Sequence, residues 1–293
     1  MLKTIELPTL LKLIDISAPY FAFDKIQVDE TNTLHANVPT QQPLGLELGP
    51  ITAAEASRHL AILGVCSCAL ANTTVQKHYY LAYRGVYEKT ANASPDSKLR
   101  AEARCVSVDR RKAEAETRLI DESGNVIVVL RVYYHVILDT TFARFYKDNF
   151  IEKPDFKLSN PYAVKHPFVK EEFTETQMTA SMGKIPEYYC SGHFPQYPAL
   201  PVAILVYNLF DMACRLMAHN LGEHDAINIV KQYEITADNL AFAGDMVELE
   251  ANYISSDENL HKIEVSGTAN GTKSVGKIEL ILERSLVGEE LYS

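Results

Sequence analysis

Two stretches of the chain are apolar almost all round, which is typical of a helix enclosed by other elements. The first follows Pro50 and runs from about Ile51 to Ala71. The second opens with Pro201, a favoured first helical residue, and keeps apolar side chains at helical spacing until it stops near Gly222. Since neither helix has a broad polar face, we expect both to be buried inside the protein.

After each helix the pattern changes to alternating or β-branched segments, which predicts strands. Turn signals separate them, such as Asp121–Asn125 and Asn270-Gly271. In the first half the expected strands are Val75–Tyr87, Leu99–Val108, Ala113–Ile120 and Val126–Leu138, and in the second half Asn228–Ile235, Met246–Ser255, His261–Ala269 and Val275–Glu283. A further strand candidate precedes each helix, Tyr20–Val28 in the first half and Glu172–Met182 in the second.

The same order of elements therefore occurs twice: a strand, a buried helix, then three or four strands. A period of half the chain indicates an internal duplication. The fold class that follows is α+β, with two antiparallel sheets that each wrap around a long buried helix. The joint is expected between Asp139 and Pro161, which gives an N-terminal unit of residues 1–148 and a C-terminal unit of residues 149–293.

Composition, charge and cysteine count limit the classes of protein to which the chain can belong. The chain has 293 residues, 47% of them apolar, enough for a sizeable core. Its formal charge of −10 argues against sequence-independent binding of nucleic acid, which needs a basic surface. An odd number of cysteines, five, without a C-x-x-C pair favours a reducing cytoplasm and no metal site. No run approaches about 20 apolar residues, so no membrane span is expected.

The segment Gly192–Pro201 carries the most informative chemistry. His193 stands in a loop stiffened by glycine and prolines, directly before a helix start. Backbone N–H groups at a helix start favour developing negative charge. This combination suits abstraction of a proton next to a carbonyl group.

The loop Gly192-His193-Phe194-Pro195, with Pro198 and Pro201, resembles the G-H-F-P-x-x-P-x-x-P loop of the β-hydroxyacyl-(acyl carrier protein) dehydratases, which have the hot dog fold. Asn239–Asp245 resembles the strand-turn segment of that family that ends in P-G-D, with Ala243 in place of the proline. Leu13–Lys25 is similar to the first helix and strand of the family. Together with the duplication, the resemblance implies a double hot dog of the dehydratase-like and thioesterase-like superfamily.

In that family the histidine comes from one hot dog and an acid from the central helix of its neighbour. In the second half the position of the acid is filled by Tyr207, and that of a following glutamine by Asp211. The first half has no histidine in its loop but carries Glu55 near the acid position, with a register uncertain by a residue or two. The resemblance therefore implies one composite site of His193 and Glu55, and a vacated second site at Tyr207 and Asp211.

The residues expected to contact substrate or a developing oxyanion are Gly192, Phe194, Gln196, Val202 and His59. Gln196 and Val202 stand where the family commonly has glycine, so the backbone would approach a thioester less closely. His59 is either an auxiliary polar group of the site or, with Arg58, a structural partner of Glu55 one helical turn away.

Structural interpretations of these residues stay open beside the functional ones. Thr52-Ala53-Ala54-Glu55 is a capping-box pattern, in which the carboxylate would bond to the backbone of Thr52. Tyr207 and Asp211 lie one turn apart and would form a hydrogen-bonded pair. His193 would be a loop histidine bonded to a neighbouring carbonyl.

The expected activity is dehydration of a 3-hydroxyacyl thioester of acyl carrier protein or coenzyme A, with no cofactor. His193 would remove the proton next to the carbonyl, Glu55 would protonate the leaving hydroxyl, and the acyl tail would lie beside Leu205 and Leu209. The alternatives are an acyl thioesterase, in which Glu55 activates water, and a non-catalytic acyl-binding subunit. Either a monomer or a homodimer of double units fits this pattern.

Overall fold

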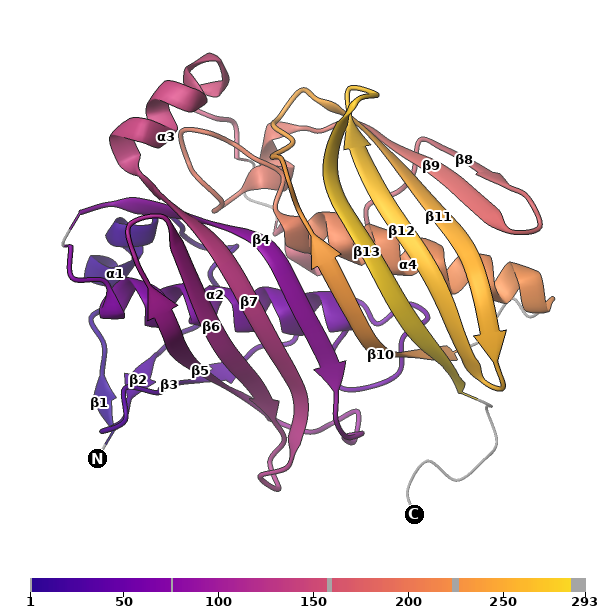
Figure 1. The fold of residues 1–293 in the computed structure, drawn as a ribbon, viewed down its shortest axis with the longest axis horizontal. Coiled ribbons are helices and arrows are strands. Elements are labelled where there is room, and N and C mark those ends of the chain that lie inside the picture. The colour runs from indigo at the N-terminus through magenta and orange to yellow at the C-terminus, as the bar shows by residue number, and fades with distance from the viewer. Residues whose placement is uncertain (1, 75, 157–159, 223–226, 286–293) are drawn as a thin grey trace.

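Two long buried helices form the centre of the molecule. The computed structural model describes residues 2–74, 76–156, 160–222 and 227–285. Helix α2 (Ala53–Ala71) begins after Thr52, whose side chain caps it, and helix α4 (Val202–Leu221) ends at Gly222 in the left-handed conformation. Both helices lie on the same side of a large antiparallel sheet (Figure 1). The sequence prediction of two enclosed helices is confirmed.

The strands form one continuous sheet in the order β1-β2-β3-β5-β6-β7-β4-β10-β13-β12-β11-β9-β8, counted over the described residues. Its first-half strands are β1 (Lys3–Thr4), β2 (Gln27–Val28), β3 (Leu34–Val38), β4 (His78–Lys89), β5 (Leu99–Val108), β6 (Lys112–Ile120) and β7 (Val126–Leu138). Its second-half strands are β8 (Lys170–Phe173), β9 (Gln177–Lys184), β10 (Ile227–Thr236), β11 (Met246–Asp257), β12 (Leu260–Ala269) and β13 (Lys273–Ser285).

The strand order of the second half mirrors that of the first. Strands β4 and β10, the first to follow the central helix in each half, pair antiparallel with Tyr87 opposite Tyr233. This pairing joins what the sequence predicts as two separate sheets into one. The sheet passes over both helices, so that the space between α2 and α4 is covered by strands from both halves (Figure 1).

The N-terminal region differs from the prediction. The expected strand Tyr20–Val28 shrinks to β2, because the aromatic side chains before it pack inward instead of pairing along a sheet edge. Phe21 and Phe23 are buried with their rings edge-to-face, and Phe23 contacts His59. The pattern also did not anticipate β1, β3 or helix α1 (Leu7–Ile14). Val75, the expected first residue of β4, lies outside the described residues.

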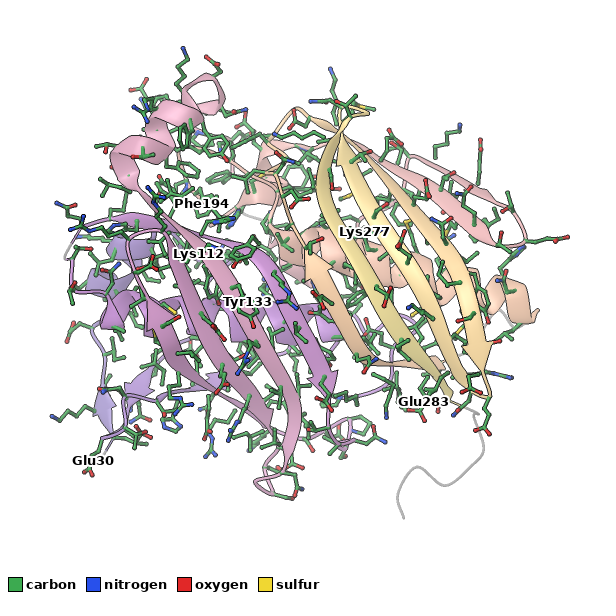
Figure 2. All side chains as sticks on the ribbon, in the orientation of Figure 1. Glu30, Lys112, Tyr133, Phe194, Lys277 and Glu283 are labelled. Carbon is green, nitrogen blue, oxygen red and sulfur yellow. The ribbon has the colours of Figure 1, made fainter. Side chains whose placement is uncertain are left out.

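The expected strand Glu172–Met182 is split into β8 and β9 by a turn closed by Thr174, whose hydroxyl accepts a hydrogen bond from the backbone of Gln177. Between the halves lies helix α3 (Asp139–Phe145), and short 3-10 helices occupy Lys147–Asn149, Pro161–Ala163 and Glu187–Cys190. Figure 2 shows side chains such as Lys277 and Glu283 on the outer face of the sheet, away from the helices.

Among the described helices, only α4 is long and apolar enough to cross a membrane, judged by length and composition. In the structure, 78% of its apolar window is buried inside the protein. A helix buried in a protein core can have the same length and apolar composition as a membrane span. Burial in the core therefore explains the composition of α4.

Candidate active site between the two helices

The loop before α4 is anchored to the N-terminal segment of the chain. Gly192 has a φ of +81°, and a Cβ atom at this position would lie 2.3 Å from the carbonyl oxygen of Ser17. The backbone N–H of Ser17 donates to the carbonyl oxygen of Gly192 over 2.9 Å. Gly192 is therefore required both for its conformation and for the close approach of the two segments. This contact fixes His193 against residues of the first half.

His193 is buried and neutral at physiological pH. Its ring Nδ1 lies 2.9 Å from the carbonyl oxygen of Ala199, which can only accept, so Nδ1 carries the proton and Nε2 the free lone pair. Burial lowers the pKa of His193 to about 4. The rings of Tyr20 and Phe194 contact the imidazole, with centroids at 4.8 and 4.0 Å. An imidazole held in this way is prepared to accept a proton at Nε2.

His193 lines an elongated cavity of about 140 Å³ that runs between the two helices and under β4, β7 and β10. Most of the lining side chains are apolar, and they come from both halves of the chain. The two helices contribute these lining residues: Ala54, Ser57, Arg58, Ala61, Ile62 and Val65 from α2, and Val202, Ala203 and Val206 from α4. Asp238 and Asn239 also line the cavity and are exposed, and Arg84 beside them is partly exposed, which marks the opening to solvent.

Arg58 is the charged side chain buried deepest in this lining, with 2% of its surface exposed. Its Nη2 atom lies 2.6 Å from Oε1 of Gln41, 3.4 Å from Oε1 of Glu55 and 3.1 Å from Nε2 of His59. Its guanidinium carbon lies 4.6 Å from the ring centre of Tyr162. The remaining nitrogens, Nε and Nη1, are buried without a hydrogen-bond partner among the described residues.

Glu55 is fully buried, and its carboxylate is engaged by the backbone. Its two oxygens accept hydrogen bonds from the N–H groups of Gln41 and Gln42 over 2.8 and 3.0 Å. Its own N–H donates to the hydroxyl of Thr52, so the expected N-cap is confirmed, but the carboxylate bonds to the preceding loop rather than back to Thr52. Glu55 is not among the described residues that line the cavity. Its pairing with His193 therefore stays a prediction, without support from this geometry.

The other expected contact residues divide into two groups. Phe194 and Val202 line the cavity beside His193, whereas Gln196 is exposed and His59 is buried behind Arg58. Phe194 packs against Phe142 of α3 with ring centres 5.6 Å apart, and it is labelled in Figure 2. Burial lowers the pKa of His59 to about 4, so this ring is neutral as well.

The expected acyl tunnel differs in its lining. Leu205 packs onto Gly267 and Gly276 of the sheet, and neither Leu205 nor Leu209 is a lining residue in the described part of the chain. Val202, Ala203 and Val206 present the other face of α4 to the cavity instead. The helical spacing predicted which residues are buried, but it could not tell the face toward the sheet from the face toward α2.

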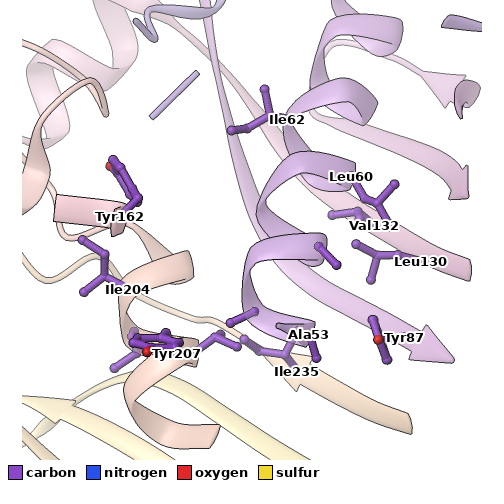
Figure 3. Close-up of a cluster of buried hydrophobic side chains, with 14 of the residues drawn as sticks. Ala53, Leu60, Ile62, Tyr87, Leu130, Val132, Tyr162, Ile204, Tyr207 and Ile235 are labelled. Atoms are coloured by element: carbon purple, nitrogen blue, oxygen red, sulfur yellow. The ribbon is translucent and has the colours of Figure 1, made fainter. Parts of the chain in front are cut away.

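The vacated site is closed by internal contacts. The hydroxyl of Tyr207 donates to the carbonyl oxygen of Pro43 over 3.0 Å, and Asp211 accepts from Nζ of Lys165 over 2.6 Å. The expected Tyr207–Asp211 hydrogen bond is replaced by these separate partners. Figure 3 shows Tyr207 on α4 close to the first turn of α2, where Ala53 lies. Neither Tyr207 nor Asp211 lines the cavity.

Sequence reasoning missed two residues of the site, Arg58 and Tyr20. Arg58 was considered only as a partner of Glu55, and Tyr20 as part of a strand. In the structure Ala53 and Val202 start their helices, and Arg58 and Tyr207 are each the sixth residue. The predicted start near Ile51 hides this correspondence. Among the described residues no group of three His, Cys, Asp or Glu side chains could hold a metal ion.

No family model matches the chain. The chain is similar in structure to the tesB protein of Mycobacterium avium subsp. paratuberculosis, at 8% identity and a TM-score of 0.57 over 96% of this chain and 100% of that one. It is also similar to the 12:0-ACP thioesterase of Umbellularia californica (7%, TM-score 0.58, 87% and 95%) and to an acyl-ACP thioesterase of Bacteroides thetaiotaomicron (15%, TM-score 0.53, 87% and 99%). These similarities, at low identity, concern the fold. They confirm the double hot dog expected from the sequence.

Proposed function

We propose that the protein is an enzyme acting on an acyl thioester of acyl carrier protein or coenzyme A, and that it eliminates water from the 3-hydroxyacyl form. The observation that carries the proposal is the neutral, buried His193, with Nδ1–H fixed by Ala199 and Nε2 left as a base, at the wall of an apolar cavity. A base of this kind needs a substrate with an acidic C–H bond, and a thioester provides one at the carbon next to its carbonyl group.

In the proposed reaction Nε2 of His193 takes that proton, and the electron pair of the C–H bond moves into an enolate. The bond from C3 to its hydroxyl group then breaks as the new double bond forms. The hydroxide takes a proton from the imidazolium of His193 and leaves as water, which returns His193 to its neutral form. The phenol of Tyr20, whose pKa burial raises to about 12, stays protonated and can donate a hydrogen bond to the leaving oxygen.

The size of the cavity favours short acyl chains. Its 140 Å³ is close to that of an engineered protein cavity that holds one benzene molecule, which corresponds to about four to six carbon atoms. The opening near Arg84, Asp238 and Asn239 would admit the carrier arm of the thioester. A substrate series should therefore start with 3-hydroxybutanoyl and 3-hydroxyhexanoyl thioesters.

Thioester hydrolysis is the second candidate, and one observation favours it. Among the described lining residues the carboxylate is Asp238, which lies at the opening, so dehydration would have no carboxylic acid beside His193 and would depend on the imidazolium and Tyr20. Hydrolysis needs only a base for water and a donor for the oxyanion, since a thiolate leaves more easily than hydroxide. The thioesterases with a similar fold agree with this possibility but do not establish it.

The test is incubation with matched 3-hydroxyacyl and saturated acyl thioesters, while the conjugated enoyl product and free thiol are followed separately. We expect enoyl product from the 3-hydroxyacyl substrate, abolished in His193→Ala. Free thiol from both substrates with no enoyl product would replace the proposal with hydrolysis. Binding of both thioesters without either product would instead identify a non-catalytic acyl-binding subunit.

A further inference from the structure

Arg58 takes the place on α2 that Tyr207 takes on α4. Each is the sixth residue of its helix, and each contacts a residue of the other half of the chain. Tyr207 bonds to Pro43 in the loop before α2. Arg58 packs on Tyr162, whose hydroxyl donates to the carbonyl oxygen of Ser191 in the loop before α4. The charged side chain of α2 that lines the cavity together with His193 is therefore a cation, where the resemblance implies an acid.

The contacts of Arg58 leave part of its hydrogen-bonding capacity unused. Gln41, Glu55 and His59 all engage Nη2, whereas Nε and Nη1 are buried with no partner among the described residues. Unpaired buried donors are rare in folded proteins because each loses its bonds to water. Since Arg58 lines the same cavity as His193, a ligand in that cavity can supply the missing acceptor.

We propose that Arg58 binds the carbonyl oxygen of the thioester and stabilises the negative charge that develops on it. This inference rests on the proposed function, since it assigns the second partner of that reaction. As His193 removes the proton, charge moves onto the carbonyl oxygen, and a fixed guanidinium in an apolar site stabilises this charge without rearrangement. Arg58 would then be a catalytic residue, and the enolate would form between the two halves of the chain.

The surroundings of Arg58 favour a carbonyl oxygen over a permanent carboxylate as its ligand. The carboxylate of Glu55 lies 3.4 Å from Nη2 and already balances the charge of the guanidinium. A carboxylate on the substrate would place a second negative charge close to Glu55 in a site of low dielectric constant, which is unfavourable. A neutral carbonyl avoids this repulsion and gains charge only during the reaction.

The same contacts give Glu55 a positioning role. Its carboxylate ties the backbone of Gln41 and Gln42 to α2, and the side chain of Gln41 in turn holds Nη2 of Arg58. The ring of His59 accepts from Nη2, which agrees with its neutral state. Together these groups hold the guanidinium in one orientation against the ring of Tyr162.

The experiment uses two unreactive probes of the same length on the full chain. In the carbonyl probe, a CH₂ group replaces the sulfur of a hexanoyl-pantetheine thioester, leaving a ketone. In the reference probe, a CH₂ group also replaces the C=O. Affinities are measured by calorimetry for wild type, Arg58→Met, Arg58→Lys and the control Arg84→Met, which removes a partly exposed lining arginine. The ratio of the two affinities does not depend on the fraction of folded protein.

We expect wild type and Arg84→Met to prefer the carbonyl probe by about 10- to 100-fold, and Arg58→Met to lose this preference. Arg58→Lys, which keeps the charge but not the planar donors, should retain part of it. Equal affinity of both probes for wild type, or an unchanged ratio in Arg58→Met, would overturn the role of Arg58 and leave the proposed function standing. If wild type binds neither probe, the proposed function itself fails.

Discussion

The two ends of the space between α2 and α4 have opposite characters, although the same architecture builds both. At one end His193 and Arg58 line a cavity, and two nitrogens of Arg58 have no hydrogen-bond partner among the described residues. At the other end the hydroxyl of Tyr207 donates to the carbonyl oxygen of Pro43, and Tyr207 does not line the cavity. The two positions correspond to each other in the duplicated pattern, and of the two side chains Arg58 lines the described cavity whereas Tyr207 does not.

At the closed end, the acidic side chains Asp211 and Glu47 form contacts within the protein. Asp211 pairs with Lys165, and Glu47 accepts from the backbone N–H of Ala53 at the start of α2. Burial raises the pKa of Glu47 to about 7. Each of these carboxylates is bonded through one oxygen, while Oδ2 of Asp211 is buried without a hydrogen-bond partner among the described residues, 3.9 Å from Arg215. Arg58 differs because two buried donors of one side chain lack a partner, and this side chain lines the cavity. The unpartnered donors of Arg58 beside the cavity therefore point to binding.

Removal of the base should have the largest effect. We expect His193→Ala to lower turnover of the 3-hydroxyacyl thioester by about 100- to 10,000-fold, because general-base catalysis contributes that much. Tyr207→Phe, the matched change at the closed end, should leave turnover within about twofold, since Tyr207 does not line the cavity. Steady-state kinetics on both variants measures this contrast. Equal losses would mean that both ends take part in the reaction.

Glu55 should matter more for stability than for chemistry. Glu55→Ala leaves the partly buried N–H of Gln41, the buried N–H of Gln42 and the buried Arg58 without this partner, so we expect a loss of about 3 kcal/mol in the free energy of unfolding. Glu55→Gln keeps an acceptor and should lose less. Urea unfolding measures both. If Glu55→Gln is as stable as wild type but has lost turnover by 100-fold or more, Glu55 is the acid of the reaction after all.

The pH dependence of turnover should reveal the lowered pKa of His193. An unperturbed histidine with a pKa near 6.5 would be about nine-tenths protonated at pH 5.5, so it would retain about a tenth of its activity as a base. Because burial lowers the pKa of His193 to about 4, we expect turnover to stay nearly constant from pH 8 down to about 5.5 and to fall only below that. A rate profile with a midpoint near 6.5 would contradict the neutral, buried base.

The smallest expected effect is at the closed end. Tyr207→Phe removes the hydrogen bond to Pro43 and should cost about 1 kcal/mol in the free energy of unfolding. Thermal unfolding of wild type and variant measures this loss. A gain of ligand binding in this variant would show that Tyr207 excludes a second substrate.

The sequence predicted most of the fold because its strongest patterns lie in the long elements. The all-round apolar character of α2 and α4 and the alternation along β5 and β7 reproduce their bounds closely. Short elements carry too few periods to be predicted, which is why β1 and β3 were missed. The pairing of β4 with β10 joins residues far apart along the chain, and a local pattern contains no signal for it.

The site was predicted only in part, for a similar reason. His193 stands in a motif that is rigid in sequence, so its role could be inferred before its surroundings were known. Glu55 and Arg58 lie three residues apart on α2, and which of them faces the cavity depends on where the helix begins. Glu55 lies in the first turn of α2 and bonds to the preceding loop, whereas Arg58, one turn further along, lines the cavity. The sequence shows which residue stands at each helix position, but it does not show toward which neighbour the side chain points.

The most direct test of a single composite site is a crystal structure of the wild-type protein with the ketone probe. We expect one probe per chain, with its carbonyl oxygen at hydrogen-bonding distance from Arg58 and the adjacent carbon beside Nε2 of His193. A probe seated beside Tyr207, or a carbonyl oxygen with no contact to Arg58, would contradict the account.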